Sequence, residues 1–496
     1  MKDSTIGWTA ALRFVFREGT PCLNIHGNTF QNLSVFSDGF TQVGIIAFES
    51  QKEAITPVLF ENNRFEQNFL IPKGLNPSVL GYKNSLVYFF NPRCSTVFKN
   101  NTFERNSAGI NAVFLVIYSQ SVLLEKINFI QQSSSRLGAL DYTSTSIYVA
   151  TQNLIVCSSY FEGNVAKSGG AFTVDYLADQ ALIAEVLLLV NITKNKFLHN
   201  LGSVRGGAIY FEDLENTPVI GEISNNHFEG NVAPRGSSIH LESVLVSNLT
   251  MAYNTFLCND LFLYKDKAVG EAIYLSKLNR AIDDKNQTLR ILHSKVVLYQ
   301  NHTPGTSAID VARVYIQNFV MKNISFSWSE KERLSASSSM TLIRASNTAI
   351  HMSFINITRV PARTPLILLG DGANVTVDSS VFSDLPMSLQ GCVFGIIQVA
   401  AEGASVTSLE LTNSTIKNII AVSVAGILAA SSPIYINSNL ASLVVRDTQF
   451  IENTASNGAA IFSSIRSDGY ASQATIQIYN STFHSNRVEN GGGAIY

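Results

Sequence analysis

The chain has 496 residues, of which 46% are hydrophobic and 15% are charged, and its formal net charge at pH 7 is −2. So few charges argue against a nucleic-acid-binding surface, which needs a stripe of basic residues, and against a disordered chain. No apolar stretch reaches the length of a transmembrane helix, and no apolar signal segment follows Met1. We therefore expect a folded protein with a polar, weakly charged surface, no nucleic-acid partner and no direct insertion into a membrane.

A two-part motif recurs along the chain. It reads Phe-x-x-Asn and is followed, about eight residues later, by Gly-Gly-Ala-Ile. In the clearest copies the two parts begin at Phe161 and Gly169, Phe197 and Gly206, Phe450 and Gly458, and Phe483 and Gly492. Self-similarity of this kind predicts a repeat architecture, in which each copy is one small structural unit stacked on the next.

The motif phenylalanine can be followed through weaker copies, with Leu298 filling a wide gap. In chain order the register is Phe30, Phe65, Phe103, Phe129, Phe161, Phe197, Phe228, Phe256, Leu298, Phe326, Phe354, Phe382, Ile416, Phe450 and Phe483. The steps average about 32 residues. Between them lie short apolar runs rich in Val, Ile, Phe, Tyr and Thr, bounded by Asn, Gly, Ser and Asp, which is the signature of strands. The sequence therefore predicts an all-β, right-handed parallel β-helix of about 15 coils that runs continuously over residues 1–496.

Each motif residue has an expected place in such a coil. Coils in register lie roughly 4.8 Å apart, so the motif phenylalanines should form an interior stack. The motif asparagine should take the left-handed backbone of a bend and bond to the neighbouring coil. The glycine pair should permit a positive φ at the next corner, and the alanine should fit a narrow interior.

Three segments depart from the coil pattern and are expected to be loops inserted at coil corners. They lie near residues 213–219, with Pro218, near the charged residues 277–290, and near the Ser-rich residues 327–340. The chain also stops within a repeat at Tyr496. Because solenoids need polar end caps, we expect either a fragment of a longer chain or a unit whose open ends meet neighbours.

Eleven Asn-x-Ser/Thr sequons are candidate N-glycosylation sites, whereas chance would give roughly six or seven. They are Asn32, Asn100, Asn191, Asn248, Asn286, Asn301, Asn323, Asn356, Asn374, Asn413 and Asn480. N-linked glycans are thus the only attached groups that we expect, and no other cofactor is indicated. The alternative interpretation is that these are ordinary corner asparagines beside Ser or Thr.

Many β-helices act on polysaccharides, so an enzyme or a carbohydrate-binding protein is the second hypothesis. Such an enzyme needs two carboxylates in a cleft, roughly 5–10 Å apart. Asp283 and Asp284 are adjacent but lie in a charged loop, and Arg359 and Arg363 form only part of a pectate lyase pattern. The glutamates after the motif phenylalanine recur by register, which favours a solvated ladder: Glu66, Glu104, Glu162 and Glu229. We nominate no catalytic residue.

Metal and redox sites are not indicated either. No two of the eight histidines have the spacing of metal ligands, and the five cysteines, Cys22, Cys94, Cys157, Cys258 and Cys392, lie far apart. Their simplest interpretation is that they are small buried apolar residues.

The pairing of Gly-Gly-Ala-Ile with Phe-x-x-Asn resembles the repeats of the chlamydial polymorphic outer membrane proteins, and related repeats occur in surface proteins of protists and algae. The bacterial proteins are secreted and are regarded as adhesins, and a bacterial-type adhesin is our third hypothesis. The sequons lean instead toward a eukaryotic secretory protein. The resemblance implies an extracellular or cell-surface location, a non-catalytic structural or adhesive role in a fibril or filament, and partners that are further copies, other surface subunits or glycans.

Overall fold

The structure is a computed structural model that describes most of the chain. The described residues are 5–7, 12–16, 23–37, 45–50, 58–72, 85–90, 95–108, 113–117, 120–144, 151–176, 187–257, 272–278, 287–298, 306–328, 340–358, 365–389, 395–400, 405–423, 432–438, 440–464, 474–491 and 493–496. They fall into two compact units, Met1–Thr250 (unit 1) and Met251–Tyr496 (unit 2). All the elements of the described part are β-strands.

Unit 1 repeats four strand positions, which we name the Gly strand, the central strand, the Phe strand and the closing strand. The Gly strands are β2 (Leu12–Phe16), β6 (Ile46–Ser50), β10 (Val87–Phe90), β14 (Phe114–Ile117), β18 (Leu140–Ser144), β22 (Phe172–Tyr176) and β28 (Ile239–Ala252). The central strands are β3 (Leu23–His26), β7 (Val58–Glu61), β11 (Ser95–Lys99), β15 (Ser121–Glu125), β19 (Thr151–Cys157) and β23 (Leu187–Thr193). β26 (Ile209–Ser224) and β28 each span both positions.

The other two positions of unit 1 hold shorter strands. The Phe strands are β4 (Thr29–Gln31), β8 (Arg64–Glu66), β12 (Thr102–Glu104), β16 (Asn128–Ile130), β20 (Tyr160–Glu162), β24 (Lys196–Leu198) and β27 (His227–Glu229). The closing strands are β1 (Thr5–Gly7), β5 (Ser34–Ser37), β9 (Phe69–Pro72), β13 (Ser107–Ala108), β17 (Ser133–Ser134), β21 (Val165–Ser168) and β25 (Leu201–Arg205).

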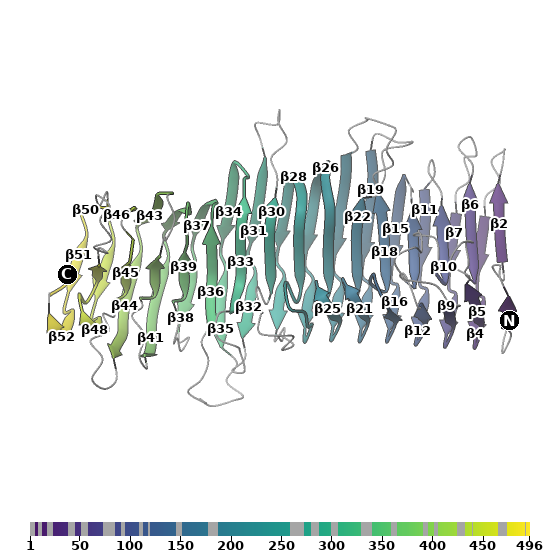
Figure 1. The fold of residues 1–496 in the computed structure, drawn as a ribbon, viewed down its shortest axis with the longest axis horizontal. Coiled ribbons are helices and arrows are strands. Elements are labelled where there is room, and N and C mark those ends of the chain that lie inside the picture. Colours follow the sequence, from purple (N-terminus) through teal and green to yellow (C-terminus); the bar gives the residue numbers. More distant parts are fainter. Residues whose placement is uncertain are drawn as a thin grey trace. The chain divides into compact units, whose positions relative to one another are not determined.

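Each strand of unit 1 pairs in parallel with the strand at the same position in the next coil. β12, for example, pairs with β8 and β16, and β11 pairs with β7 and β15. Figure 1 shows β7, β11 and β15 side by side. A chain whose successive turns hydrogen-bond only to equivalent positions of neighbouring turns is a parallel β-helix, so the predicted fold class is confirmed.

Unit 2 repeats the same arrangement. Its Gly strands are β30 (Ile273–Leu278), β33 (Thr306–Val314), β36 (Met340–Ser346), β39 (Ile367–Leu369), β42 (Ile397–Val399), β45 (Ile434–Ile436) and β49 (Ile461–Ser463). Its central strands are β31 (Thr288–Leu292), β34 (Asn318–Lys322), β37 (Ala349–Ser353), β40 (Asn374–Asp378), β43 (Thr407–Thr412), β46 (Ala441–Arg446) and β50 (Thr475–Tyr479).

The Phe strands of unit 2 are β29 (Thr255–Leu257), β32 (Lys295–Leu298), β35 (Ser325–Trp328), β38 (Asn356–Thr358), β41 (Val381–Leu389), β44 (Thr415–Ser423), β47 (Gln449–Ile451) and β51 (Thr482–His484). β48 (Thr454–Asn457) and β52 (Arg487–Gly491) are closing strands, and β41 and β44 extend into that position. Unit 1 has seven described Phe strands and unit 2 has eight, so the expected fifteen coils are found.

The interior of unit 1 is a stack of the motif phenylalanines. Phe161 and Phe197 have ring centroids 4.9 Å apart with planes tilted by 12°, and Phe197 and Phe228 are 4.9 Å apart at 7°. All seven rings from Phe30 to Phe228 are buried. Stacking at the coil spacing lets one residue type fill the core of every turn, as the sequence predicts.

In unit 2 two positions of the predicted register are wrong. Strand pairing places Val296, not Leu298, beside Phe256 and Phe326, and Ile357, not Phe354, between Phe326 and Phe382. Val296 and Ile357 are buried, whereas Phe354 is 49% exposed. β-branched residues suit a buried strand, and the spacing of phenylalanines alone could not reveal that they replace the aromatic here.

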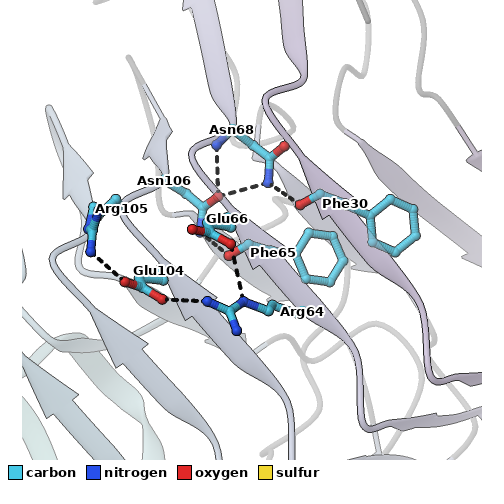
Figure 2. A network of polar contacts seen from close by, with 8 residues as sticks. All are labelled: Phe30, Arg64, Phe65, Glu66, Asn68, Glu104, Arg105 and Asn106. Carbon is cyan, nitrogen blue, oxygen red and sulfur yellow. Dashed lines mark hydrogen bonds and ion pairs between the residues drawn. The ribbon is translucent and has the colours of Figure 1, made fainter. Parts of the chain in front are cut away.

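The predicted role of the motif asparagine is half right. The left-handed backbone belongs to the residue before it, for example Gln67 before Asn68 and His199 before Asn200, with φ of 52° at both positions. The motif asparagine is instead buried and bonds along the stack. The amide Nδ2 of Asn68 donates to the Phe30 carbonyl oxygen (3.0 Å) of one neighbouring coil and to Asn106 Oδ1 (2.9 Å) of the other (Figure 2).

The glycine pair has two separate tasks. The first glycine takes a positive φ, which is 55° at Gly206, as the sequence predicts. The second approaches the next coil so closely that a Cβ on Gly207 would lie 2.8 Å from the backbone nitrogen of Val232. Ala208 then fits the buried corner with no exposed surface. Glycine is thus required once for its dihedral freedom and once for its missing side chain.

One of the three expected loops is not a loop. Residues 213–219 lie inside β26, which continues from the Gly position to the central position, and among these seven residues only Asp213 has a positive φ (55°). The chain turns there by a single-residue bend, so no insertion is needed. Residues 279–286 and 329–339 of the other two expected loops lie outside the described residues. That one continuous β-helix joins the two units stays a prediction.

Candidate functional site

The predicted sequons are the candidate functional residues that the structure places most clearly. Nine of the eleven are described, and Asn286 and Asn301 lie outside the described residues. Seven of the nine are exposed: Asn100, Asn191, Asn248, Asn356, Asn374, Asn413 and Asn480. Asn32 and Asn323 are partly exposed. All nine therefore reach the surface, which is what attachment of a bulky glycan requires.

Five of these sequons lie at coil corners and share one geometry. Asn32, Asn100, Asn323, Asn413 and Asn480 all have a positive φ, between 46° and 53°. The next residue of each sequon turns inward, as Asn101 does, and the Ser or Thr that follows begins a strand with its side chain outward, as Thr102 does. The left-handed corner, which asparagine tolerates well, thus aims the sequon side chain at solvent.

The other four sequons lie within strands. In β23 the exposed Asn191 and the half-buried Thr193 flank Ile192, which is fully buried. Because side chains alternate between the two faces of a strand, an inward middle residue turns both the asparagine and the Ser/Thr outward. Asn248, Asn356 and Asn374 share this arrangement with Leu249, Ile357 and Val375 as the buried middle residues.

Several sequon side chains are already held by a neighbouring coil. Asn413 Nδ2 donates to Asp378 Oδ1 (3.0 Å), and Asn480 Nδ2 donates to Asp447 Oδ1 (2.6 Å). Partial burial acts to raise the pKa of Asp378, but hydrogen bonds from Asn413, Thr412 and Ser379 outweigh it and hold that pKa below its ordinary value. An N-glycosylated amide keeps one N–H, so these contacts are compatible with an attached sugar.

The outer face of the Phe strands carries ion pairs (Figure 2). Glu66 and Glu104 are in register on β8 and β12, so two like charges lie one above the other. Arg64 lies 3.2 Å from Glu66 and 3.1 Å from Glu104, and Arg105 lies 2.8 Å from Glu104. Surface pairs of this kind contribute about 1 kcal/mol at most, so they neutralise the ladder rather than build an active site.

Repetition of the motif glutamates along this face is interrupted. Glu162 is in register with Ile130 and Leu198, and Glu229 is also in register with Leu198. Tyr160 donates a hydrogen bond to Glu162 (2.9 Å) and His227 lies 2.9 Å from Glu229. All four glutamates thus occupy the predicted register position, although only Glu66 and Glu104 are direct neighbours, and all four carboxylates have partners.

A second ionic cluster in unit 1 joins Arg205, at the end of the closing strand β25, to residues of the long strands β26 and β28. Arg205 Nη1 is 3.2 Å from Glu212 Oε1 and 2.9 Å from Glu242 Oε2, and it donates to the Tyr210 hydroxyl at 2.7 Å. The buried His240 stacks edge-on against Tyr210, and burial lowers the pKa of His240 and raises that of Glu212.

This cluster is relevant to the carbohydrate-enzyme hypothesis. Glu212 and Glu242 both contact one nitrogen of Arg205, so they lie well within the roughly 10 Å that separate glycosidase carboxylates at most. The guanidinium of Arg205, however, forms an ion pair with each of them. This group was not predicted from the sequence, although both glutamates follow a motif isoleucine, Ile209 or Ile239, by the same three residues.

A buried acid, Asp141, lies on β18, which β22 separates from β26, and it has no exposed surface. Neither of its carboxylate oxygens has a hydrogen-bond partner. Burial raises the pKa of Asp141 well above its usual range, and the nearby Asp175 raises it further, whereas Arg136 lowers it. Asp141 is therefore protonated under conditions in which an ordinary aspartate is ionised.

The remaining sequence candidates give no site among the described residues. That part of the chain contains no group of three or more His, Cys, Asp or Glu able to hold a metal ion. Cys157 is a free, half-buried thiol whose pKa is raised by burial, and the other four cysteines lie outside the described residues, as do Asp283, Asp284, Arg359 and Arg363. A helix able to span a membrane is also absent from the part of the chain that the structure describes.

Comparison with known proteins gives distant likenesses. No family model matches the chain. A transmembrane domain-containing protein of Dictyostelium discoideum is 23% identical over 389 residues, which are 75% of this chain and 20% of that protein. The chain thus spans about a fifth of the length of this relative. Among solved structures, a tailspike protein mutant of the E. coli bacteriophage HK620 in complex with a hexasaccharide aligns over 95% of this chain and 73% of its own, with a TM-score of 0.33 and 10% identity.

Proposed function

We propose that the chain is a non-catalytic, structural or adhesive segment of an extracellular surface protein and that it carries N-linked glycans on its outward-facing sequons. The observation that carries this proposal is the common orientation of the nine described sequons. Their asparagines all reach the surface, through two different local geometries, and none of them is buried. A repeat spread over fifteen coils supplies a large surface, and large glycosylated surfaces suit contact roles.

The distant relative supports a segment of something larger. This chain matches only 20% of a protein whose name includes a transmembrane domain. A glycosylated β-helix placed outside the cell by such a protein is the arrangement that we propose. The partners are further copies of the chain, other surface subunits, or glycans, as the resemblance to the polymorphic outer membrane protein repeats implies.

The carbohydrate-active alternative rests on Glu212 and Glu242. Their separation and the raised pKa of Glu212 favour it, and the ion pairs with Arg205 weigh against it, because one guanidinium already engages both carboxylates. The bacterial-adhesin alternative shares the surface role but would leave the sequons bare.

Site mapping on material from the native source tests the proposal. N-glycans are released enzymatically in heavy-oxygen water, which converts each glycosylated asparagine to a labelled aspartate, and peptides are analysed by mass spectrometry. We expect label at the exposed sequons, above all at Asn100, Asn191 and Asn413. Asn62 and Asn225 are internal controls, because they have the same corner φ (56° and 55°) but lie outside any sequon. Unlabelled asparagine at every described sequon would refute the proposal and favour the bacterial-type adhesin.

A further inference from the structure

One corner of unit 2 places aromatic side chains in a row with a sequon. Two positions before the Phe strands of four successive coils lie Tyr253, His293, Asn323 and Phe354. Backbone hydrogen bonds connect these coils at that point, from Tyr253 to Leu292 (3.0 Å), from His293 to Lys322 (2.9 Å) and from Asn323 to Ser353 (3.1 Å). The four side chains therefore follow one another at the coil spacing of roughly 4.8 Å.

The aromatic residues of this row do not contribute to the stability of the fold in an obvious way. Tyr253, His293 and Phe354 have φ of 56°, 46° and 53°, a region that histidine tolerates but that is unfavourable for the bulkier side chains of tyrosine and phenylalanine. They are also exposed, with 56% of Tyr253 and 49% of Phe354 accessible to solvent. The equivalent corner of unit 1 carries no aromatic residue and holds Gly27, Asn62, Asn100, Lys126, Ser158, Lys194 and Asn225. Neither backbone preference nor packing in the core therefore explains why aromatic residues occupy this corner. Residues held in an unfavourable backbone region often mark a functional site.

The rings are arranged around the sequon. Those of Tyr253 and His293 stack in parallel, with centroids 4.9 Å apart and planes tilted by 5°. Asn323 Nδ2, the atom that would carry a sugar, is 3.1 Å from His293 Nδ1. On the other side of Asn323 in the row, the Phe354 ring has the ammonium group of Lys322 5.3 Å from its centroid.

We propose that Tyr253, His293 and Phe354 form a platform on which the first pyranose rings of an N-glycan at Asn323 pack. This rests on the proposed function, because it requires Asn323 to be glycosylated. The C–H bonds on one face of a pyranose are weakly positive and fit the negative face of an aromatic ring. The remaining N–H of a glycosylated Asn323 still donates to His293, which holds the first sugar near the rings, and the Lys322 ammonium is positioned to bond its hydroxyls.

The test separates the glycan from the platform with two sets of variants. Ser325→Ala removes the sequon while Asn323 and its contact with His293 stay in place, and Phe354→Asn and Tyr253→Gly remove rings with residues that tolerate the corner backbone. Thr415→Ala is the matched control, because the sequon at Asn413 lies in the same corner row between Ser379 and Asp447, without aromatics. Thermal unfolding is measured for each variant made in a glycosylating host, after site mapping at Asn323.

We expect Ser325→Ala to lower Tm by about 1 °C in the chain with its platform, a loss of roughly 1 kcal/mol in a protein of this size, and to have no such effect in the ring-removed variant. Thr415→Ala should leave Tm unchanged in both. Equal effects of Ser325→Ala with and without the rings would overturn the inference while leaving the proposed function intact.

A bare Asn323 in native material would overturn the inference and would also count against the proposed function at this sequon.

A second experiment distinguishes the source of the sugar. Unglycosylated chain is titrated with the disaccharide of two N-acetylglucosamine units, with the Tyr253 ring observed by NMR. Saturable binding that Phe354→Asn abolishes, together with a bare Asn323, would assign the platform to a saccharide of another molecule and reject the role proposed here.

Discussion

At the scale of single residues, the most unusual feature is a buried acidic side chain, that of Asp141. Asp141 lies in β18 between Leu115 and Thr173 of the neighbouring coils, with no exposed surface and no hydrogen bond to either oxygen. Its pKa in the folded chain is raised well above the usual value, so the folded chain keeps a proton that the unfolded chain releases. By linkage, the free energy of unfolding then falls as the pH rises from about 4 toward the folded pKa.

Asp141→Asn should remove this dependence. The substitution keeps the shape and cannot ionise, so the variant should match the parent near pH 4 and be more stable than it at pH 8. For one proton the difference grows by about 1.4 kcal/mol per pH unit across the window. Chemical denaturation at pH 4, 6 and 8 measures it, with Glu104→Gln on the ion-paired surface as the control. A difference that does not change with pH would contradict the assignment.

At the scale of elements, buried asparagine ladders join the coils. Asn200 Nδ2 donates to Asn231 Oδ1 (2.9 Å) and to the Phe161 carbonyl oxygen (3.0 Å), and its Oδ1 accepts from Asn164 Nδ2 (2.8 Å). A second ladder runs at the corner before the Phe strands, where Asn63 Nδ2 donates to Asn101 Oδ1 (3.1 Å). Each rung thus satisfies polar groups that the closed turn would otherwise leave unpaired in the interior.

Asn200→Ala removes one rung and all its bonds at once. We expect the free energy of unfolding to fall by about 3 kcal/mol. This is the upper end of the cost of leaving one buried polar group without a hydrogen bond, and it applies because the substitution leaves several such groups unpaired. The control is Asn318→Ala at the exposed start of β34, where the change should stay below about 0.5 kcal/mol. Denaturant titration measures both variants. A loss for Asn200→Ala as small as that for Asn318→Ala would contradict a contribution of the ladder to stability.

The Phe strands and the asparagine ladders show which parts of the fold could be predicted from the sequence. The phenylalanine register of unit 1 was predictable because the motif is regular there and every ring is interior. In unit 2, Phe354 and Ile357 compete for one interior position, and nothing in the local sequence tells which apolar residue points inward. The second ladder was not predicted because Asn101 and the sequon residue Asn100 look alike in sequence, although one is buried and the other exposed.

The candidate sites differ in the same way. Sequons are local, so all were found in the sequence, and their outward direction follows once the buried middle residue is known. The grouping of Arg205, Glu212 and Glu242 depends on which coils lie side by side, and that becomes visible only from the register of the repeat.

At the scale of the whole molecule, the low net charge affects how strongly copies of the protein repel one another in solution. With 15% charged residues, a net charge of −2 and a sequence pI of about 6.5, the polypeptide has little electrostatic repulsion near neutrality. Under the proposed function, surface glycans supply the hydration that charge does not. Contacts between copies should then be governed by glycan coverage more than by salt.

Sedimentation velocity on native and enzymatically deglycosylated protein between pH 5 and 8 tests this. Native material should associate with increasing concentration, and deglycosylated material should associate more strongly, with a maximum near pH 6.5, by at least about a doubling of mean mass. Native protein that stays monomeric at every concentration would contradict self-association. Identical behaviour before and after deglycosylation would contradict the role given to the glycans.

Equivalent positions pair with equivalent positions throughout each unit, and this has a genetic consequence. A duplication or deletion that begins and ends at the same point of the motif leaves every ladder, from the phenylalanines to the asparagines, able to re-form across the new junction. The gene can therefore gain or lose whole turns by unequal recombination without passing through an unfoldable intermediate. We expect natural variants of this protein to differ by complete turns, while partial turns are removed by selection.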